Sequence, residues 1–333
     1  MKSEDMKDDN YQIYLQQKHA KFSVSSEVVE NAVVEATGSE LKSSKRIIAG
    51  EANEVYDVKT EGGNLIVRIS RSGENRFIPE KWAIEKARRV GVPAPEILLI
   101  TKGKDKGKRI YVSVETKLPG VPLGQLIETK SLSEAETKRI VQNAGGMLAK
   151  IHSIIPKKFG RLHRTGIGKY NTWVSYMLSP LEEEQIEALK KSAVKNSITT
   201  GDIDKALQIL KDQRSVYQGI TPHLLHGDFG PKHILVESGK ISGILDFENV
   251  KSGDPIYDFS WWSYFSKNRP PIEWLKEGYE KVASLPYDFD LKLRLGRLRL
   301  GADFIWYYDM EDHDVGLTVA KENLQEDLAW FSQ

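Results

Sequence analysis

The chain contains no cysteine among its 333 residues, which excludes disulfide bonds, thiolate metal sites and cysteine nucleophiles. It also lacks an excess of charge of one sign, because 48 lysines and arginines balance 47 aspartates and glutamates. That balance argues against a nucleic-acid partner and against an electrostatic role at a membrane surface. The remaining composition, 40% hydrophobic and 29% charged, is typical of a globular protein large enough for two lobes with a core.

Long apolar runs are also missing. No stretch approaches the roughly 18 consecutive apolar residues of a membrane span. Residues 1–10 are polar and charged and contain no apolar segment of a secretion signal. We therefore expect a cytoplasmic protein with no membrane partner, which works as a monomer or a weak dimer.

The first third of the chain is rich in predicted strands. Short apolar runs bounded by glycine, and two helical patterns, indicate the elements. The predicted strands are 46–49, 54–59, 65–69, 96–100 and 109–115, the predicted helices are 25–36 and 77–90, and the charged residues 102–108 are predicted as a hairpin loop.

The rest of the chain is mainly helical in pattern. Ser133 and Glu136 form the capping-box signature of a helix over 133–152, residues 157–169 are predicted as a loop, and 173–210 as mostly helical. Strand-like segments return over 222–247, and the chain is helical from 257 onward. Strands first and helices later predict an α+β fold with two lobes, 1–117 and 118–333.

The chemistry is concentrated in one stretch. His226-Gly227-Asp228 is followed by His233, by Asp246 between apolar residues, and by Gly253-Asp254-Pro255 with Asp258. Phosphoryl transfer needs a carboxylate near the attacking hydroxyl, divalent cations on the phosphates and a cation to neutralise charge. Asp228 is suited to the first task, and Asp246 with His233 to holding the metal. The alternative is that these acids merely cap turns.

This ordered series resembles the aminoglycoside phosphotransferase family, the antibiotic kinases of the protein-kinase-like fold that include aminoglycoside, hygromycin and macrolide phosphotransferases. The resemblance runs from about Lys45 to the C-terminal region. It implies a five-stranded antiparallel sheet in the N-terminal lobe and a mainly helical C-terminal lobe. It also implies that Asp228 is the catalytic base, that His233 and Asp246 hold Mg²⁺, and that ATP or GTP is the phosphate donor.

The same resemblance implies a nucleotide site in the first lobe. The first hairpin would have Gly50 and Asn53 at its tip, although one glycine is a poor phosphate cradle. Arg68 takes the position of the phosphate-binding lysine, with Glu80 favoured over Glu85 as its partner. A solvent-facing arginine and surface helix charges are the alternatives.

The hinge between the lobes would bind the base of the nucleotide. The resemblance places the hinge at Ser113, Glu115 and Lys117. Relatives use adenine or guanine, so both donors stay open.

Other functional classes fit less well. A protein kinase carries a long activation segment after its metal-binding aspartate, but here Asp246 is followed closely by Gly253 and no Ala-Pro-Glu is nearby. A pseudokinase would be expected to have lost Asp228 or Asp246, and both are present.

The acceptor is the open question, and residues 302–314 bear on it. They combine acids with aromatic residues, which would suit a cationic aminoglycoside between the catalytic loop and the C-terminal helices. The candidate acceptor-binding residues are Tyr308, Asp309, Glu311 and Asp312. The alternative for them is an exposed acidic helix end. Macrolide kinases and housekeeping kinases of choline, homoserine or sugars share the fold and stay alternatives.

Overall fold

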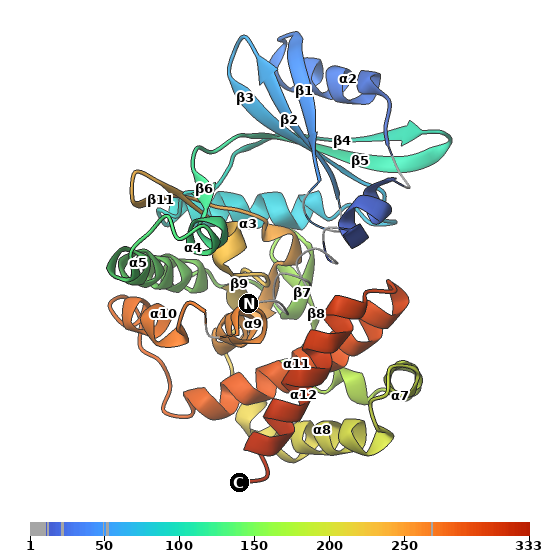
Figure 1. The fold of residues 1–333 in the computed structure, drawn as a ribbon, viewed down its shortest axis with the longest axis vertical. Coiled ribbons are helices and arrows are strands. Elements are labelled where there is room, and N and C mark those ends of the chain that lie inside the picture. The colour runs from blue at the N-terminus through green and yellow to red at the C-terminus, as the bar shows by residue number, and fades with distance from the viewer. Residues whose placement is uncertain (1–10, 12, 21–22, 49, 51–52, 268) are drawn as a thin grey trace.

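The computed structural model describes residues 11, 13–20, 23–48, 50, 53–267 and 269–333. The chain forms two lobes, with a sheet in the upper lobe and helices filling the lower lobe (Figure 1). The predicted α+β class and the five-stranded antiparallel sheet are confirmed. None of the helices among these residues is both long and apolar enough to cross a membrane.

The N-terminal sheet has the order β1-β2-β3-β5-β4. Its strands are β1 (Leu41–Ile47), β2 (Asn53–Thr60), β3 (Asn64–Ser70), β4 (Ile97–Asp105) and β5 (Lys108–Thr116). Helix α2 (Ser26–Thr37) buries Val29 and Val33 against the β-branched residues of the sheet, and α3 (Phe77–Arg89) lies between the sheet and the lower lobe (Figure 1). Alternating apolar side chains on these strands thus supply one hydrophobic face for α2 to cover.

Two predicted boundaries in this sheet were wrong. Strand β1 begins at Leu41 rather than at 46, and β4 continues through most of the charged stretch predicted as a loop. The hairpin turn consists only of Lys106 and Gly107, which both have positive φ. The charged strand end is stable because buried Asp105 pairs with Arg71 at 3.2 Å, a partner distant in the sequence.

The lower lobe consists mainly of helices. They are α4 (Leu123–Glu128), α5 (Glu134–His152), α6 (Trp173–Met177), α7 (Glu183–Lys195), α8 (Thr200–Asp212), α9 (Ile256–Ser266), α10 (Ile272–Tyr279), α11 (Phe289–Met310) and α12 (Asp314–Trp330). The predicted capping box of Ser133 and Glu136 is present at the start of α5.

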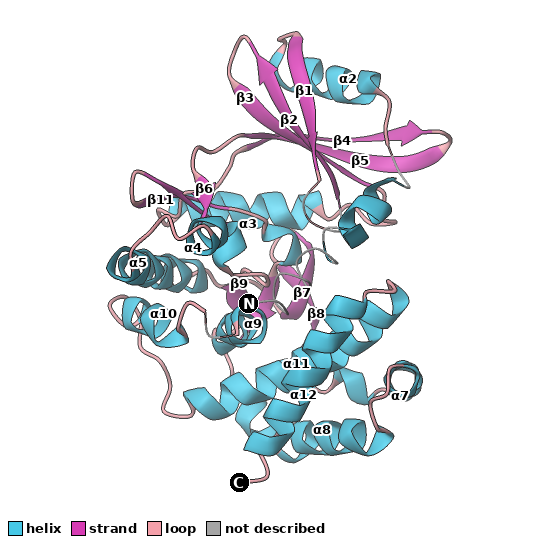
Figure 2. Cartoon of the chain, in the orientation of Figure 1, coloured by secondary structure: helices cyan, strands magenta, loops and turns pink. Residues whose placement is uncertain are grey.

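Short strands lie between the sheet and these helices (Figure 2). They are β6 (Val121–Pro122), β7 (Phe159–Arg164), β8 (Ile167–Tyr170), β9 (His223–Leu225), β10 (Ile234–Glu237), β11 (Lys240–Ile244) and β12 (Lys251–Gly253). Strands β7 and β8 form a hairpin where a loop was predicted, because β12 pairs with both β7 and β9 and completes a sheet.

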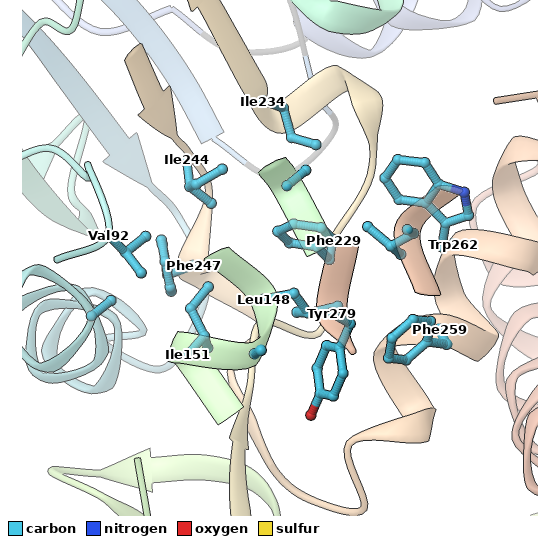
Figure 3. Packing of buried hydrophobic residues seen from close by; sticks show 14 of the residues in the cluster. Val92, Leu148, Ile151, Phe229, Ile234, Ile244, Phe247, Phe259, Trp262 and Tyr279 are labelled. Carbon is cyan, nitrogen blue, oxygen red and sulfur yellow. The ribbon is translucent and has the colours of Figure 1, made fainter. Parts of the chain in front are cut away.

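The core of the lower lobe anchors the predicted motif. Phe229 and Phe247, the residues that directly follow Asp228 and Asp246, are fully buried. They lie in one cluster with Leu148 and Ile151 of α5 and with Trp262 of α9 (Figure 3). Each motif aspartate is therefore adjacent to a side chain held in the core, which restricts the loop that carries it.

A helix over residues 13–20 connects the two lobes. Its Lys18 Nζ lies 2.6 Å from Glu311 Oε2 at the end of α11, and its His19 Nε2 lies 2.9 Å from the Gly50 carbonyl oxygen beyond β1. Leu15 and His19 are both buried. The segment that precedes the first strand thus contacts the hairpin of one lobe and the C-terminal helices of the other.

Candidate active site

The loop that carries Asp228 is held by Asp258 of α9. The Asp258 carboxylate accepts hydrogen bonds from the backbone N–H groups of His226 and Gly227, both at 2.8 Å. Gly227 has φ +79°, and a Cβ on it would lie 2.0 Å from the Asn249 carbonyl oxygen, so only glycine fits. The loop geometry therefore depends on a buried carboxylate and on one glycine.

Asp258 is itself supported by a buried histidine. His152 Nε2, at the end of α5, lies 3.0 Å from Asp258 Oδ2, and His152 Nδ1 lies 3.1 Å from the Tyr279 hydroxyl. Burial alone would raise the pKa of Asp258, but the His152 contact and the backbone donors hold that pKa below its usual value. His152 thus supports the loop from behind and does not touch the base.

His226 joins the two halves of the motif. Its ring is fully buried, which lowers its pKa, and its Nε2 lies 2.9 Å from the Leu245 carbonyl oxygen. Because Leu245 directly precedes Asp246, this contact ties the loop of the base to the loop of the second carboxylate.

The Asp228 carboxylate has three close partners. Trp261 Nε1 of α9 donates a hydrogen bond to Oδ1 at 2.8 Å, Lys232 Nζ lies 3.3 Å from Oδ1, and His233 Nε2 lies 3.3 Å from Oδ2. Burial alone would raise the pKa of Asp228, but the Lys232 ammonium and the contact with His233 hold it well below its usual range. Asp228 is therefore ionised and oriented at neutral pH, as an acceptor of a hydroxyl proton must be.

Trp261 was not identified as a site residue from the sequence. It is buried, and its indole N–H contacts Asp228. Its spacing could have identified it as a site residue, because Trp261 lies three residues after Asp258 on the same helix face.

Three predicted residues converge on one possible metal position. Ligand atoms of Asp228, His233 and Asp246 all lie within 4.8 Å of one another. Asp246 follows β11 in a left-handed backbone conformation, φ +62°, which aims its carboxylate at His233, 3.6 Å away. The two carboxylates are the hard oxygen donors that Mg²⁺ prefers, and a histidine is the less usual member of the set. A magnesium ion held here would neutralise charge on the nucleotide phosphates.

Arg68 of β3 lies at the centre of a carboxylate cluster. Its Nη1 is 2.5 Å from Glu80 Oε1 of α3, and its Nη2 is 3.3 Å from Glu248 Oε2. Asp246 and Glu115 each lie 3.7 Å from the same guanidinium. Burial and the neighbouring carboxylates raise the pKa of Glu80 to about 8, although the Arg68 charge acts to lower it. The structure thus brings Arg68 together with Glu80, not with Glu85.

Glu248 was missed in the sequence, although it directly follows Asp246 and Phe247. Besides Arg68, it accepts a 2.6 Å hydrogen bond from Asn53 Nδ2 at the start of β2. The side chain of Asn53, predicted to contact the nucleotide, therefore joins the upper lobe to the lower one here. Gly50 has φ +74°, and its neighbours 49, 51 and 52 at the hairpin tip lie outside the described residues.

The predicted hinge residues differ in their surroundings. Ser113 is fully buried and pairs with Arg68 across β3 and β5, and Glu115 lies on the same face of β5 near that arginine. Lys117 instead pairs with Asp57 at 2.7 Å and is partly exposed. Ser113 and Glu115 belong to the Arg68 cluster, whereas the Lys117 side chain is engaged by β2.

Each candidate acceptor residue of the segment 302–314 is engaged within the protein or exposed, and its role in acceptor binding stays a prediction. The four candidates Tyr308, Asp309, Glu311 and Asp312 have separate surroundings. Asp309 bonds to Ser192 and Asn196 and pairs with Lys195, all of α7 or its end, while Tyr308 is buried against His313. Glu311 pairs with Lys18, and the Asp312 side chain is 91% exposed. The reason is geometric, because successive residues of a helix point to different neighbours.

A lysine, rather than an acid, lies beside Trp261, the indole partner of Asp228. Lys251 of β12 places its Nζ 5.4 Å from the centre of the Trp261 ring and 5.9 Å from that of Tyr257. Burial, with Arg161 nearby, lowers the pKa of Lys251 to about 8. No carboxylate among the described residues lies within 4 Å of this ammonium.

The site contains the parts that phosphoryl transfer requires: an ionised and oriented carboxylate, a second carboxylate at one metal position and a buried arginine. The profile of the APH family, described as a phosphotransferase enzyme family, matches residues 43–281. The chain belongs to this family. It is therefore a phosphotransferase with an alcohol group as acceptor.

Relatives within the APH family agree with this assignment. The hygromycin-B 4-O-kinase of Escherichia coli is 21% identical over 264 residues, which cover 77% of this chain and 72% of the relative. The fold is similar to that of a thermostable mutant of the aminoglycoside phosphotransferase APH(4)-Ia without ligand, with a TM-score of 0.74 and 18% identity over 91% of this chain and 99% of the other. A ternary complex of an APH(4)-Ia mutant with AMP-PNP and hygromycin B gives a TM-score of 0.73 at 18% identity, over 90% and 97%.

Proposed function

We propose that this enzyme transfers the γ-phosphate of ATP or GTP to a hydroxyl group of an aminoglycoside-like antibiotic, and that hygromycin B is the first acceptor to test. The observation that carries the acceptor is the likeness to a hygromycin-B kinase along 77% of the chain. ATP is the first donor to test, because a structural neighbour was solved with AMP-PNP.

The chemistry assigns one task to each side chain of the site. Asp228 takes the proton of the acceptor hydroxyl, whose oxygen forms a bond to the γ-phosphorus while the bond to the β–γ bridging oxygen breaks and the nucleoside diphosphate leaves. Trp261 holds one carboxylate oxygen of Asp228 in place. Asp246 and His233 are proposed to hold Mg²⁺, and Arg68, oriented by Glu80, is proposed to contact the phosphates.

This proposal gives each lobe a different role. Residues 1–117 would bind the nucleotide, with Gly50, Asn53, Ser113, Glu115 and Lys117 near it, and residues 118–333 would carry the catalytic loop and the acceptor. A monomer or weak dimer in the cytoplasm suits an enzyme that uses ATP or GTP.

An acceptor screen tests the proposal. Release of nucleoside diphosphate is measured with ATP and with GTP over hygromycin B, a gentamicin-type aminoglycoside, a macrolide, choline and homoserine, with the Asp228→Asn variant as the blank. We expect turnover with hygromycin B or another aminoglycoside that the variant lacks. Turnover confined to the macrolide, choline or homoserine would overturn the assignment of the acceptor and leave the assignment of Asp228 intact.

A further inference from the structure

The helix over residues 13–20 contacts a part of the lower lobe that lies far from it in the sequence. Its Lys18 Nζ is 2.6 Å from Glu311 Oε2, at the corner between α11 and α12. Both the helix and this corner lie outside residues 43–281, the range that the APH family profile matches. Figure 1 places the helix, in dark blue, beside the junction of the two lobes. The contact is therefore a feature of this chain that the family profile does not include.

One face of the helix is held on the lower lobe by an ion pair and a ring contact. Lys18 Nζ also donates a hydrogen bond to the Tyr14 hydroxyl at 3.1 Å, and the side chains of Lys18 and Glu311 are 16% and 35% exposed. The Tyr14 ring lies 4.3 Å from that of His313, which caps α12 by accepting a hydrogen bond from the Gly316 backbone N–H. An ion pair partly shielded from water is stronger than one in open solvent. The helix is thus anchored at the start of α12.

The neighbouring face of the helix holds the β1–β2 hairpin. The buried His19 ring accepts at Nδ1 from Arg46 Nη2 of β1 at 3.3 Å, because a guanidinium group can only donate. The ring hydrogen therefore lies on Nε2, which donates to the Gly50 carbonyl oxygen at 2.9 Å. Beyond the helix, the Val24 backbone N–H donates to Glu54 Oε2 of β2 at 3.2 Å. Both strands of the hairpin thus contact the helix or the segment that follows it.

The helix connects two regions that have different roles in the proposed reaction. At a rise of about 1.5 Å per residue, residues 13–20 form a stiff spacer of about 12 Å. At one end lies Gly50, in the hairpin that is proposed to contact the nucleotide, whereas Asp228 is oriented separately by Trp261 of α9. A hairpin that is held in one position before the nucleotide arrives loses less conformational freedom on binding, which favours affinity. The helix is therefore placed to act on donor binding rather than on the transfer step.

We propose that residues 13–20 form an inter-lobe strap, in which His19 is a positioning residue that holds the β1–β2 hairpin in place for the phosphate donor. Lys18 and Glu311 anchor the strap on the lower lobe. This inference rests on the proposed nucleotide site around Gly50, and it gives Glu311 an effect on the donor rather than on the acceptor. The strap raises nucleotide affinity and leaves the rate of the transfer step unchanged.

Three variants of the protein test the two ends of the strap. His19→Phe keeps a ring but removes the donor to Gly50, His19→Gln keeps an N–H group at a similar reach, and Glu311→Gln neutralises the anchor. Glu277→Gln is the matched control, because Glu277 also pairs with a lysine, Lys138 at 3.0 Å, on the surface of the lower lobe.

Three quantities are measured for each protein. They are the equilibrium affinity for AMP-PNP and for GMP-PNP, the hydrogen exchange of β1 and β2 without nucleotide, and kcat and KM with ATP and hygromycin B. If hygromycin B is not turned over, ATP hydrolysis with water as the acceptor is measured instead. The split between kcat and the KM of the donor separates donor positioning from a change in the transfer step.

We expect His19→Phe to weaken nucleotide binding about threefold to tenfold, the scale of one hydrogen bond, and to speed hydrogen exchange in β1 and β2. Glu311→Gln should weaken the same binding about twofold to fivefold, the scale of one ion pair. His19→Gln should bind within about twofold of the parent, because its amide N–H replaces that of Nε2. For all three, kcat at saturating donor should stay within about twofold of the parent.

Three results would overturn the inference. One is nucleotide affinity and hydrogen exchange in both His19→Phe and Glu311→Gln that match those of Glu277→Gln. Another is nucleotide binding in His19→Gln as weak as in His19→Phe, which would make His19 a packing residue only. The third is a loss of kcat as large as the loss of affinity. If His19→Phe does not fold, the partly exposed Glu311→Gln change decides.

The parent protein separates this inference from the proposed function. If the parent binds a nucleotide and turns it over while the strap variants behave like the control, only the role of the strap fails. If the parent binds neither AMP-PNP nor GMP-PNP, the proposed function fails together with the strap.

Discussion

The two sides of Asp228, the proposed base, differ in how their charges are arranged. On the phosphate side, Asp228, His233 and Asp246 converge within 4.8 Å, and Arg68 binds Glu80. On the side of α11, the acids predicted to bind an acceptor are paired with the protein's own cations or exposed. The residues of the proposed phosphate side thus contact one another directly, whereas the acidic residues of the C-terminal helices mainly join helices.

The difference has a local cause. The residues of the phosphate side lie on short loops next to buried Phe229 and Phe247, so sequence spacing translates directly into proximity. Residues 302–310 lie on a long helix, where a change of one position rotates a side chain by about 100° toward another neighbour. Charge pattern alone therefore predicts the proximity of side chains well on anchored loops and poorly on a helix.

The largest expected effect is at the base. Asp228→Asn should lower turnover by about 10² to 10⁴-fold, because an amide cannot accept the hydroxyl proton. Nucleotide affinity should persist, since Arg68 and Asp246 are untouched. Steady-state turnover and equilibrium binding of AMP-PNP measure the two quantities, with Asp312→Asn as the exposed control. Turnover near that of the parent would remove Asp228 from the mechanism.

The two proposed metal ligands should differ in their effects. Asp246→Ala should abolish the magnesium-dependent part of nucleotide binding, because the main oxygen ligand is lost. His233→Asn should keep substantial activity, because an amide oxygen can replace a nitrogen that Mg²⁺ does not favour. Titration calorimetry with and without magnesium distinguishes them. Equal damage from both changes would mean that His233 does more than hold a cation.

The pH dependence of stability tests the effect of the buried Lys251 charge. Its pKa of about 8 in the folded protein lies below the usual value of 10.5. Burial of the charged ammonium group therefore destabilises the folded protein, and this destabilisation is complete below pH 8. Between pH 8 and 10.5 the unfolded chain binds more protons, so the stability of the parent rises with pH. Lys251→Met should therefore stabilise the protein by roughly 2 to 3 kcal/mol at pH 7, with a gain that shrinks toward pH 10.5.

Chemical denaturation over this pH range measures that gain. Lys169→Met is a matched control, since Lys169 also lies over an aromatic ring, that of Tyr170 at 5.4 Å, but is exposed. A gain for Lys251→Met that does not change with pH would show that the charge is not the cause.

The smallest effects distinguish two of the acids that were predicted to bind the acceptor. Asp309→Ala should lower the free energy of unfolding by about 1 to 2 kcal/mol, because three donors from α7 and its end lose their acceptor. Asp312→Ala should change it by less than about 0.5 kcal/mol, as exposed substitutions usually do. Neither should change the KM of the acceptor. A raised KM in Asp309→Ala at unchanged stability would restore the acidic acceptor pocket.

Much of the fold and of the phosphate side could be predicted from the sequence. Strand and helix periodicity, the capping box and the ordered motif are local signals, and the family resemblance indicated Glu80. The residues that were missed depend on contacts between distant segments. Trp261 donates a hydrogen bond to Asp228, and Glu248 contacts Arg68 and Asn53 in the other lobe.

The wrong secondary-structure predictions have the same origin. Residues 157–169 lack a strong strand pattern and become a hairpin only because β12, far along the chain, pairs with β7. Residues 102–105 are charged and still extend β4, because Arg71 supplies a partner for Asp105. Tertiary pairing overrides local propensity in both segments.

The helix over residues 13–20 has a practical consequence for handling the protein. It is held between Gly50 and Glu311, beside the junction of the lobes, whereas α12 ends at the far pole of the lower lobe (Figure 1). A purification tag, a fluorescent fusion or a linker to a solid support that is joined ahead of this helix therefore begins next to the junction. One joined behind α12 begins well away from it, so this end of the lower lobe suits fusions for kinetic work and surface immobilisation.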